Sequence, residues 1–171
     1  MINCKSKKFR VILLALSLCV GFSESTFALE AGNKAPDFDL PGDQGMVKLS
    51  KSEGSVVYVD FWASWCGPCR QSFSWMNDTQ EKYRSQGLKI IGINLDAKNE
   101  DAKKFLTQIP AKFTIAYDSK GVIPKNYGVK GMPTSFLIGR DGKIIFQHLG
   151  FKDADRESLD KQIKAALEAR K

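Results

Sequence analysis

Apolar residues in this chain follow two kinds of pattern: short continuous runs, and longer stretches in which they recur every three or four residues. Two runs of strand length, residues 55–62 and 88–95, are almost wholly β-branched, aromatic or aliphatic. Such runs are typical of strands buried on both faces in a parallel sheet covered by helices. Between them, residues 66–85 carry apolar side chains at helical spacing and end before Gly87, which predicts an amphipathic helix.

The alternation of strands and helices continues to the end of the chain. The further predicted elements are two short strands around the turn 41–45 (35–40 and 46–49), a helix over 100–108, a strand over 113–117, a helical turn within 119–128, strands at 135–138 and 143–148, and a helix from about Asp155. Asp141-Gly142 is a strong hairpin signal, so the last two strands should pair antiparallel. The pattern predicts an α/β fold whose mixed sheet has helices on both sides.

The first 28 residues form a separate segment by pattern. Four basic residues precede an almost wholly apolar run over 11–22, and Thr26-Phe27-Ala28 places small residues before a cut after Ala28. This arrangement is typical of a secretory signal peptide, and the run is shorter than the roughly 20 residues of a membrane-spanning helix. We expect residues 1–28 to be a signal peptide and residues 29–171 the folded domain of an exported, periplasmic protein. An uncleaved N-terminal membrane anchor is the alternative.

Removal of that segment changes the charge and the cysteine content. The 171 residues include 26 Lys and Arg against 19 Asp and Glu, and removing four basic residues and one acidic residue leaves 22 against 18. The remaining excess of four positive charges is scattered along the sequence, which argues against a nucleic-acid-binding stripe. Of four cysteines, only Cys66 and Cys69 remain, in a chain of one domain's length.

The candidate chemistry is concentrated in Trp65-Cys66-Gly67-Pro68-Cys69-Arg70, at the predicted change from strand to helix. Free backbone N–H groups and the helix dipole stabilise an anion at a helix N-terminus, so the Cys66 thiolate should be the attacking nucleophile. Cys69, one turn later, should be buried and should resolve a mixed disulfide by bonding to Cys66. Pro68 suits the first turn, where a missing N–H matters little. The pattern favours redox catalysis with no cofactor beyond the Cys66–Cys69 disulfide itself.

Other uses of the cysteine pair fit the sequence less well. A structural zinc site needs about four ligands, and residues 29–171 supply only His148 as a further sulfur or nitrogen ligand. Attachment of a c-type haem requires a histidine after the second cysteine, where Arg70 stands. A purely structural disulfide across so short a loop stabilises little. A Cu(I)-binding chaperone, or a thiol-binding module without turnover, stays open because two thiolates can hold a soft ion.

Two segments carry a resemblance to a known family. Residues 55–69 (SVVYVDFWASWCGPC) resemble the active-site strand and turn of the thioredoxin superfamily, and residues 128–138 (GVKGMPTSFLI) resemble its second signature, a loop ending in a cis-proline. The segment APDFDL and the additional portion around 95–117 resemble the TlpA/ResA-type subgroup of exported thiol-disulfide oxidoreductases. The resemblance implies a thioredoxin-like fold with an N-terminal β extension and an internal strand-helix insertion. It also implies protein-disulfide reductase activity on proteins that contain disulfides.

The resemblance also assigns roles outside the cysteine pair. It implies that Pro133 follows a cis peptide bond and lies against the two cysteines, and that the Met132 backbone pairs with an extended substrate chain. The apolar surface that receives the substrate would comprise Trp65, Gly67, Pro68, Gly131, Met132 and Pro133. Ordinary packing is the competing interpretation of Trp65 and Met132.

Asp60 is the one charged residue within the buried run 55–62. Burial disfavours the ionised carboxylate, which raises its pKa and suits it to proton exchange near neutrality. Asp60 stands six residues before Cys66, where thioredoxins carry the buried acid that takes a proton from the resolving cysteine. We therefore expect Asp60 to accept a proton from Cys69, directly or through one water. The competing interpretation is that Asp60 merely satisfies local backbone donors.

Three positions differ from the subgroup's pattern. Ser72 and Ser74 stand where an acidic residue and a proline usually follow the second cysteine, and Ala97 stands where many members carry a glutamate. The acid arrangement therefore resembles that of thioredoxin, which argues against a dedicated role in cytochrome c maturation. The Gly-Pro pair between the cysteines resembles that of the reducing members, so we expect a reductase. The resemblance implies a membrane electron carrier of the DsbD or CcdA type as its reductant.

Overall fold

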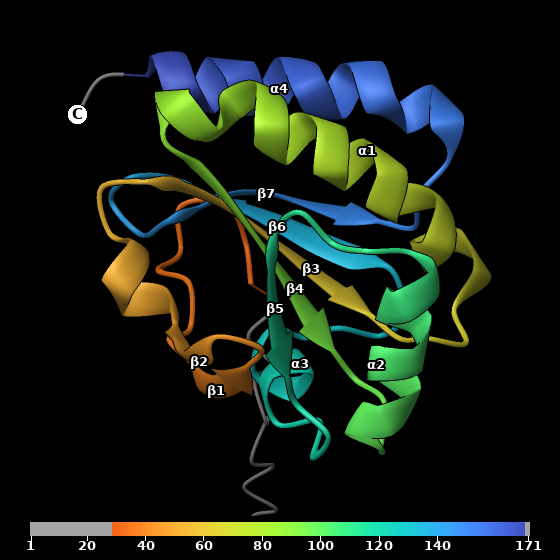
Figure 1. The fold of residues 1–171 in the computed structure, drawn as a ribbon. Coiled ribbons are helices and arrows are strands. Elements are labelled where there is room, and N and C mark those ends of the chain that lie inside the picture. The colour runs from red at the N-terminus through yellow and green to blue at the C-terminus, as the bar shows by residue number, and fades with distance from the viewer. Residues whose placement is uncertain (1–28, 170–171) are drawn as a thin grey trace, which may run out of the picture.

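In the computed structural model, which describes residues 29–169, the chain folds around one seven-stranded mixed sheet (Figure 1). The predicted signal peptide, residues 1–28, lies outside the described residues. The strands are β1 (Asp39–Gly42), β2 (Gly45–Lys48), β3 (Val56–Trp62), β4 (Leu88–Asn94), β5 (Thr114–Tyr117), β6 (Thr134–Ile138) and β7 (Ile144–Leu149). Their order across the sheet is β2-β1-β5-β4-β3-β6-β7.

Helices cover the two faces of this sheet unequally. The α-helices are α1 (Gly67–Tyr83), α2 (Asn99–Gln108), α3 (Ile123–Asn126) and α4 (Arg156–Glu168). Apolar side chains of α1, α2 and α4 pack with those of β3 and β4 in one core cluster, and α1 and α4 lie side by side (Figure 1). The other face is covered by α3 and the N-terminal segment 35–49. Helices therefore lie on both sides, as predicted, and none in the described part is long and apolar enough to cross a membrane.

Three adjacent strands, β4, β3 and β6, bring the two sequence signatures together. β3 is buried along its whole length, pairs in parallel with β4 and pairs antiparallel with β6. Alternation along β3 directs Tyr58 and Trp62 to one core cluster and Val59 and Phe61 to the other. Phe61 lies opposite Thr134, so the end of β3 and the start of β6 meet at the same end of the sheet.

The N-terminal β extension is present, but its strands are shifted from the predicted positions 35–40 and 46–49. β1 and β2 are joined at Asp43-Gln44, and Gly45 has a φ of +112°, a conformation that favours glycine. This tight turn sets the register of β1 against β2, in which Gly42 pairs with Gly45 and so belongs to β1. The insertion adds α2 and β5, and β1 meets β5 only where Gly42 lies opposite Ala116. A side chain at Gly42 would come within 2.6 Å of the Ile115 carbonyl oxygen, so the strands cross closely there.

Candidate active site

Cys66 is the residue that caps the N-terminus of α1. Its backbone is extended, with φ −84° and ψ 106°, and its Sγ accepts a hydrogen bond from the Cys69 backbone N–H at 3.3 Å. Pro68 lies in the first turn, where its missing N–H breaks no helical hydrogen bond. The Cys66 sulfur is thus held at the positive end of a 17-residue helix, where the dipole and the free N–H groups stabilise a thiolate.

The two cysteines form a disulfide in this structure. The sulfur atoms are 2.03 Å apart and the Cα atoms 5.3 Å apart. Cys69 is fully buried, as expected, and Cys66 retains 6% of its surface. Gly67 and Pro68, between them, are exposed. An incoming sulfur atom can therefore approach the pair only from the Cys66 side.

The loop before β6 lies at the end of the sheet where β3 leads into the cysteine pair. The peptide bond between Met132 and Pro133 is cis, as the resemblance implied. The Thr134 hydroxyl donates to the Gly131 carbonyl at 2.7 Å, and the Pro133 carbonyl accepts from the Gly150 N–H at 2.8 Å, so the loop is held from both sides. Met132 is half-buried and packs against the core cluster that contains both cysteines. The fold thus brings the two predicted motifs to the same end of the sheet.

Two large apolar side chains are exposed at this end of the sheet. Trp65 is 72% exposed, so ordinary core packing does not account for it. Leu149, at the end of β7, is 70% exposed and pairs with Thr134, the residue after Pro133. Exposed apolar groups that gather beside a reactive site are typical of an interaction surface. Leu149 was not predicted from the sequence. The feature that could have indicated it is a large apolar residue at an outward-facing position at the end of a predicted strand.

Asp60 occupies the middle of β3, between Gly92 of β4 and Ser135 of β6. Alternation puts its side chain on the face of Tyr58 and Trp62, the face that α1 covers. The residue is 2% exposed, and its Oδ2 has no hydrogen-bond partner within residues 29–169. Burial raises the pKa of the Asp60 carboxyl well above its ordinary value. Oδ2 accepts no backbone hydrogen bond from the described residues, so binding of backbone donors does not account for its burial. It lies on the face of the sheet that is covered by α1, the helix that begins at the cysteine pair.

Asp96 is a site residue that sequence reasoning missed. It is buried just after β4, and its Oδ2 accepts the Ser64 N–H at 3.0 Å and the Asn94 side-chain amide at 2.8 Å. Its Oδ1 accepts the Ser64 hydroxyl at 3.0 Å. The carboxylate therefore fastens the turn that carries Trp65 and Cys66 to the end of the neighbouring strand. The available signal was an Asn-x-Asp sequence at the carboxyl end of a buried strand.

We expect Asp96→Ala to lower the free energy of unfolding by about 1.5–3 kcal/mol, because the donors of the part-buried Ser64 and the buried Asn94 lose a charged acceptor. The loosened turn should also lower kcat/KM for insulin reduction about tenfold, since small displacements at a reactive group slow its chemistry. Urea unfolding and steady-state kinetics measure the two effects. Asp96→Asn keeps one acceptor oxygen and should lose less. An Asp96→Ala variant no different from the exposed-residue control Asp78→Ala would contradict this positioning role.

The three positions that differ from the subgroup's pattern have ordinary surroundings. Ser72 is buried and its hydroxyl donates to the Cys69 carbonyl at 2.9 Å, a local bond within α1. Ser74 and Ala97 are exposed. Within residues 29–169, no group of three or more His, Cys, Asp or Glu side chains lies close enough to hold a metal ion. The candidate ligands for a soft metal ion are therefore the two thiols of the reduced cysteine pair.

Comparison with known proteins relates most of the chain to one family. The family model Redoxin matches residues 30–163. Thiol-disulfide oxidoreductase ResA of Bacillus cereus is 39% identical over 166 residues, which cover 91% of this chain and 94% of the relative. The ResA protein of Geobacillus thermodenitrificans is 34% identical over 142 residues, covering 78% and 81%.

Solved structures give the same relationship. A Chlorobium tepidum structure, assigned as a thiol:disulfide interchange protein DsbE, superimposes with a TM-score of 0.81 at 64% identity, over 82% of this chain and 99% of that one. A thiol:disulfide interchange protein from Bacteroides sp. has a TM-score of 0.71 at 26% identity, over 83% and 95%. The two structures agree with the fold predicted from the sequence.

Proposed function

The chain belongs to the Redoxin family of the thioredoxin superfamily and is a thiol-disulfide oxidoreductase, and on this premise we propose that it is an exported protein-disulfide reductase. The observation that carries the proposal is the asymmetry of the cysteine pair. Cys66 lies at the positive end of α1 on the accessible side, and Cys69 is fully buried on the face of the sheet that holds Asp60. One sulfur is therefore suited to attack a substrate and the other to resolve the product.

The catalytic cycle starts from the reduced pair. The Cys66 thiolate attacks one sulfur of a substrate disulfide, forms a mixed disulfide and releases the other substrate sulfur as a thiolate. The positive end of α1 stabilises the attacking anion. The attack leaves Cys69 as the only thiol of the pair.

Resolution of the mixed disulfide requires a deprotonated Cys69. Asp60 accepts the Cys69 proton, directly or through one water, and the new thiolate attacks the Cys66 sulfur. The Cys66–Cys69 disulfide forms, the second substrate thiolate leaves, and two electrons have passed to the substrate. A carboxylate with a raised pKa suits this step because it can return the proton when the pair is reduced again.

The substrate is a protein disulfide presented in an extended chain. In this proposal, the Met132 backbone pairs with that chain, and its apolar side chains rest on the surface around the cysteine pair. The surface comprises Trp65, Gly67, Pro68, Gly131, Met132 and Pro133, to which the exposure of Leu149 adds one residue. Aromatic and aliphatic groups of this kind accept many sequences, which suits a reductase of varied proteins.

Two features of the sequence support the proposed direction and place of the reaction. The Gly67-Pro68 pair resembles that of reducing family members, and the N-terminal 28 residues have the pattern of a secretory signal. We therefore infer a periplasmic reductase that is itself reduced by a membrane carrier of the DsbD or CcdA type. An uncleaved N-terminal segment would place the same domain on the membrane surface.

The reduction potential of the Cys66–Cys69 pair tests the direction. We expect a value near the thioredoxin end of the family range, about −270 mV, when the pair is equilibrated with glutathione buffers and the disulfide fraction is followed by thiol alkylation. A value near the oxidising end, about −120 mV, would instead identify an oxidase. Stoichiometric Cu(I) uptake by the reduced protein, together with negligible insulin reduction, would replace the enzyme by a metal-binding chaperone.

A further inference from the structure

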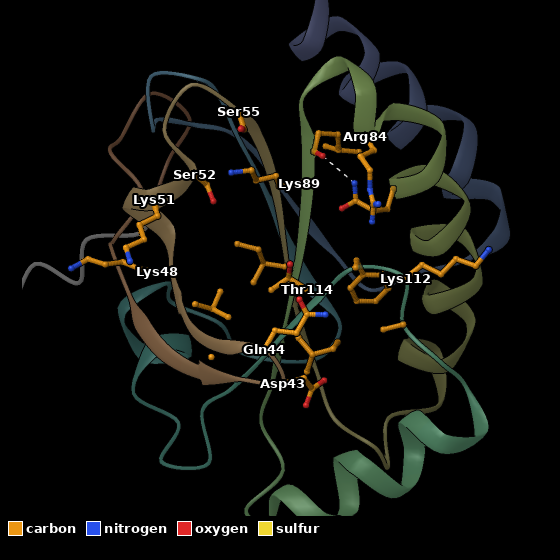
Figure 2. A pocket seen from close by; sticks show the side chains of 18 of the residues that line it. Asp43, Gln44, Lys48, Lys51, Ser52, Ser55, Arg84, Lys89, Lys112 and Thr114 are labelled. Carbon is orange, nitrogen blue, oxygen red and sulfur yellow. Dashed lines mark hydrogen bonds between the residues drawn. The ribbon is translucent and has the colours of Figure 1, made fainter.

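A large cleft lies at the end of the sheet opposite the cysteine pair (Figure 2). Its volume is about 930 Å³. One wall is the turn after β1, β2 and residues 51–55, and the other is the end of α1 with Arg84 and the loop before β5. The cleft exists because β5 begins only at Thr114, which pairs with Ile91. Residues 88–90 of β4 therefore have no strand beside them on this edge.

The open edge of β4 is closed by one side chain. The Gln80 amide nitrogen donates to the Leu88 carbonyl at 3.0 Å, and the Gln80 amide oxygen accepts the Ile90 N–H at 2.7 Å. A primary amide offers the same donor and acceptor as a peptide group, so Gln80 takes the place that a neighbouring strand would fill. An occupant of the cleft is therefore recognised by side chains and not by addition of a strand to β4.

The lining of the cleft is strongly basic. The cations are Lys48, Lys51, Arg84, Lys89 and Lys112, and the single acid is Asp43, whose carboxylate accepts the Tyr117 hydroxyl at 2.5 Å. Lys48 and Lys112 have carboxylate partners outside the lining, Asp39 at 4.0 Å and Glu81 at 2.9 Å. In the described part of the chain, Lys51, Arg84 and Lys89 have no carboxylate within 4.0 Å.

This distribution of charge selects the sign of the occupant. Figure 2 places Lys51 and Lys89 on the side of the cleft near Ser52 and Ser55, and Arg84 across from them. Like charges that share a concave surface repel one another, and their summed potential attracts anions. The cleft is thus complementary to a group of negative charges.

The size of the cleft and its apolar lining indicate which class of molecule could bind there. Apolar side chains lie among the cations, and Met46 of β2 is 62% exposed. The other apolar lining residues include Leu88, Ile91, Phe113 and Ile115. A volume of about 930 Å³ is at the upper end of the range for drug-sized ligands, so it exceeds the need of a single small anion. A flat membrane surface does not enter a concave site.

We propose that this cleft binds an extended acidic segment of a partner polypeptide, with carboxylates on Lys51, Arg84 and Lys89 and apolar side chains on the floor. The cleft is formed at the amino end of β4, whereas Cys66 follows the carboxyl end of the parallel strand β3. A bound partner therefore leaves the cysteine pair accessible. The site is independent of the direction of electron flow, because it shares no residue with the redox centre.

The test measures fluorescence anisotropy of a labelled peptide of about 12 residues, rich in Glu with Val between the acids, against the full folded domain. We expect saturable binding that weakens as NaCl rises, because salt screens the charge pairs. The double variant Lys51→Glu/Lys89→Glu should bind at least about tenfold more weakly, since it makes like charges face each other. Insulin reduction by this variant should stay at the wild-type rate.

The control variant Lys103→Glu/Lys161→Glu makes the same change of charge at exposed positions of α2 and α4, outside the cleft. It should bind within about twofold of wild type, because long-range charge is screened beyond the Debye length. An equal loss in both double variants would overturn the proposal. So would complete displacement of the peptide by millimolar phosphate, or binding to anionic phosphatidylserine vesicles without binding to the peptide. Lys51→Gln/Lys89→Gln, which removes the charges without reversing them, repeats the test if the Glu variant unfolds.

Discussion

The Cys66→Ser variant should lose insulin reduction by at least about a thousandfold, because a serine hydroxyl at this position is neither ionised near neutral pH nor able to form a disulfide. The sulfur that it replaces is the one at the accessible side of the pair, at the start of α1. The N-cap position tolerates serine well, so the fold should persist. Turbidity from reduced insulin measures the activity, and thermal unfolding checks the fold.

Cys69→Ser is the matched control, since it makes the same change of atom one turn later. It should keep the first attack and lose the second, so mixed disulfides with substrate proteins should accumulate on Cys66. Mass spectrometry after acid quenching measures this adduct. Accumulation of adducts on Cys69 in the Cys66→Ser variant, at the rate seen on Cys66, would reverse the two roles.

Asp60→Asn should slow release of the substrate from the mixed disulfide by about a hundredfold at neutral pH, the lower end of what general base catalysis contributes. The amide has the shape of the acid but cannot accept the Cys69 proton. The wild-type rate should change with pH through the raised pKa of Asp60, and the variant should lose this step of the profile. Stopped-flow measurement of release from a preformed mixed disulfide isolates the step. An unchanged profile would leave Asp60 without a catalytic role.

The same substitution has a second effect, on stability, whose sign follows from burial. The pKa of Asp60 is higher in the folded chain than in the unfolded chain, so the folded chain binds the proton more tightly. Its contribution to stability is therefore present below the ordinary carboxyl pKa and is lost as pH rises through the raised value. Asp60→Asn should become more stable than wild type as pH rises. Asp101→Asn, at an exposed acid of α2, is the control and should show no such trend.

The fold could be predicted from the sequence mainly where burial left a periodic signal. The continuous apolar runs at 55–62 and 88–95 are the two central strands, and Asp141-Gly142 sits in the predicted hairpin. The first hairpin was placed less well, because its register depends on a tight turn at Gly45 and on a single meeting with β5. Such features depend on contacts between strands and leave little trace in local sequence.

The candidate site divides in the same way. Cys66, Cys69 and Pro133 were predicted because motifs mark them. Asp96 and Leu149 were not, since each belongs to the site only through a partner distant in sequence. Asp96 reaches Ser64 across 32 residues, and Leu149 reaches the loop before β6 through strand pairing. The basic cleft was also missed, because it depends on the register of β5 against β4, in which Thr114 pairs with Ile91.

The Gln80 side chain also bears on self-association. A strand edge with bare N–H and C=O groups can recruit a strand from another molecule, which is a route to aggregation. In the folded chain the Gln80 amide occupies those groups on β4. Because Gln80 belongs to α1, this protection lasts only while the helix is docked. Partial detachment of α1 would expose both the unpaired edge of β4 and the apolar side of the helix. Resistance to aggregation and the structure of the helix that carries the cysteine pair therefore depend on the same packing.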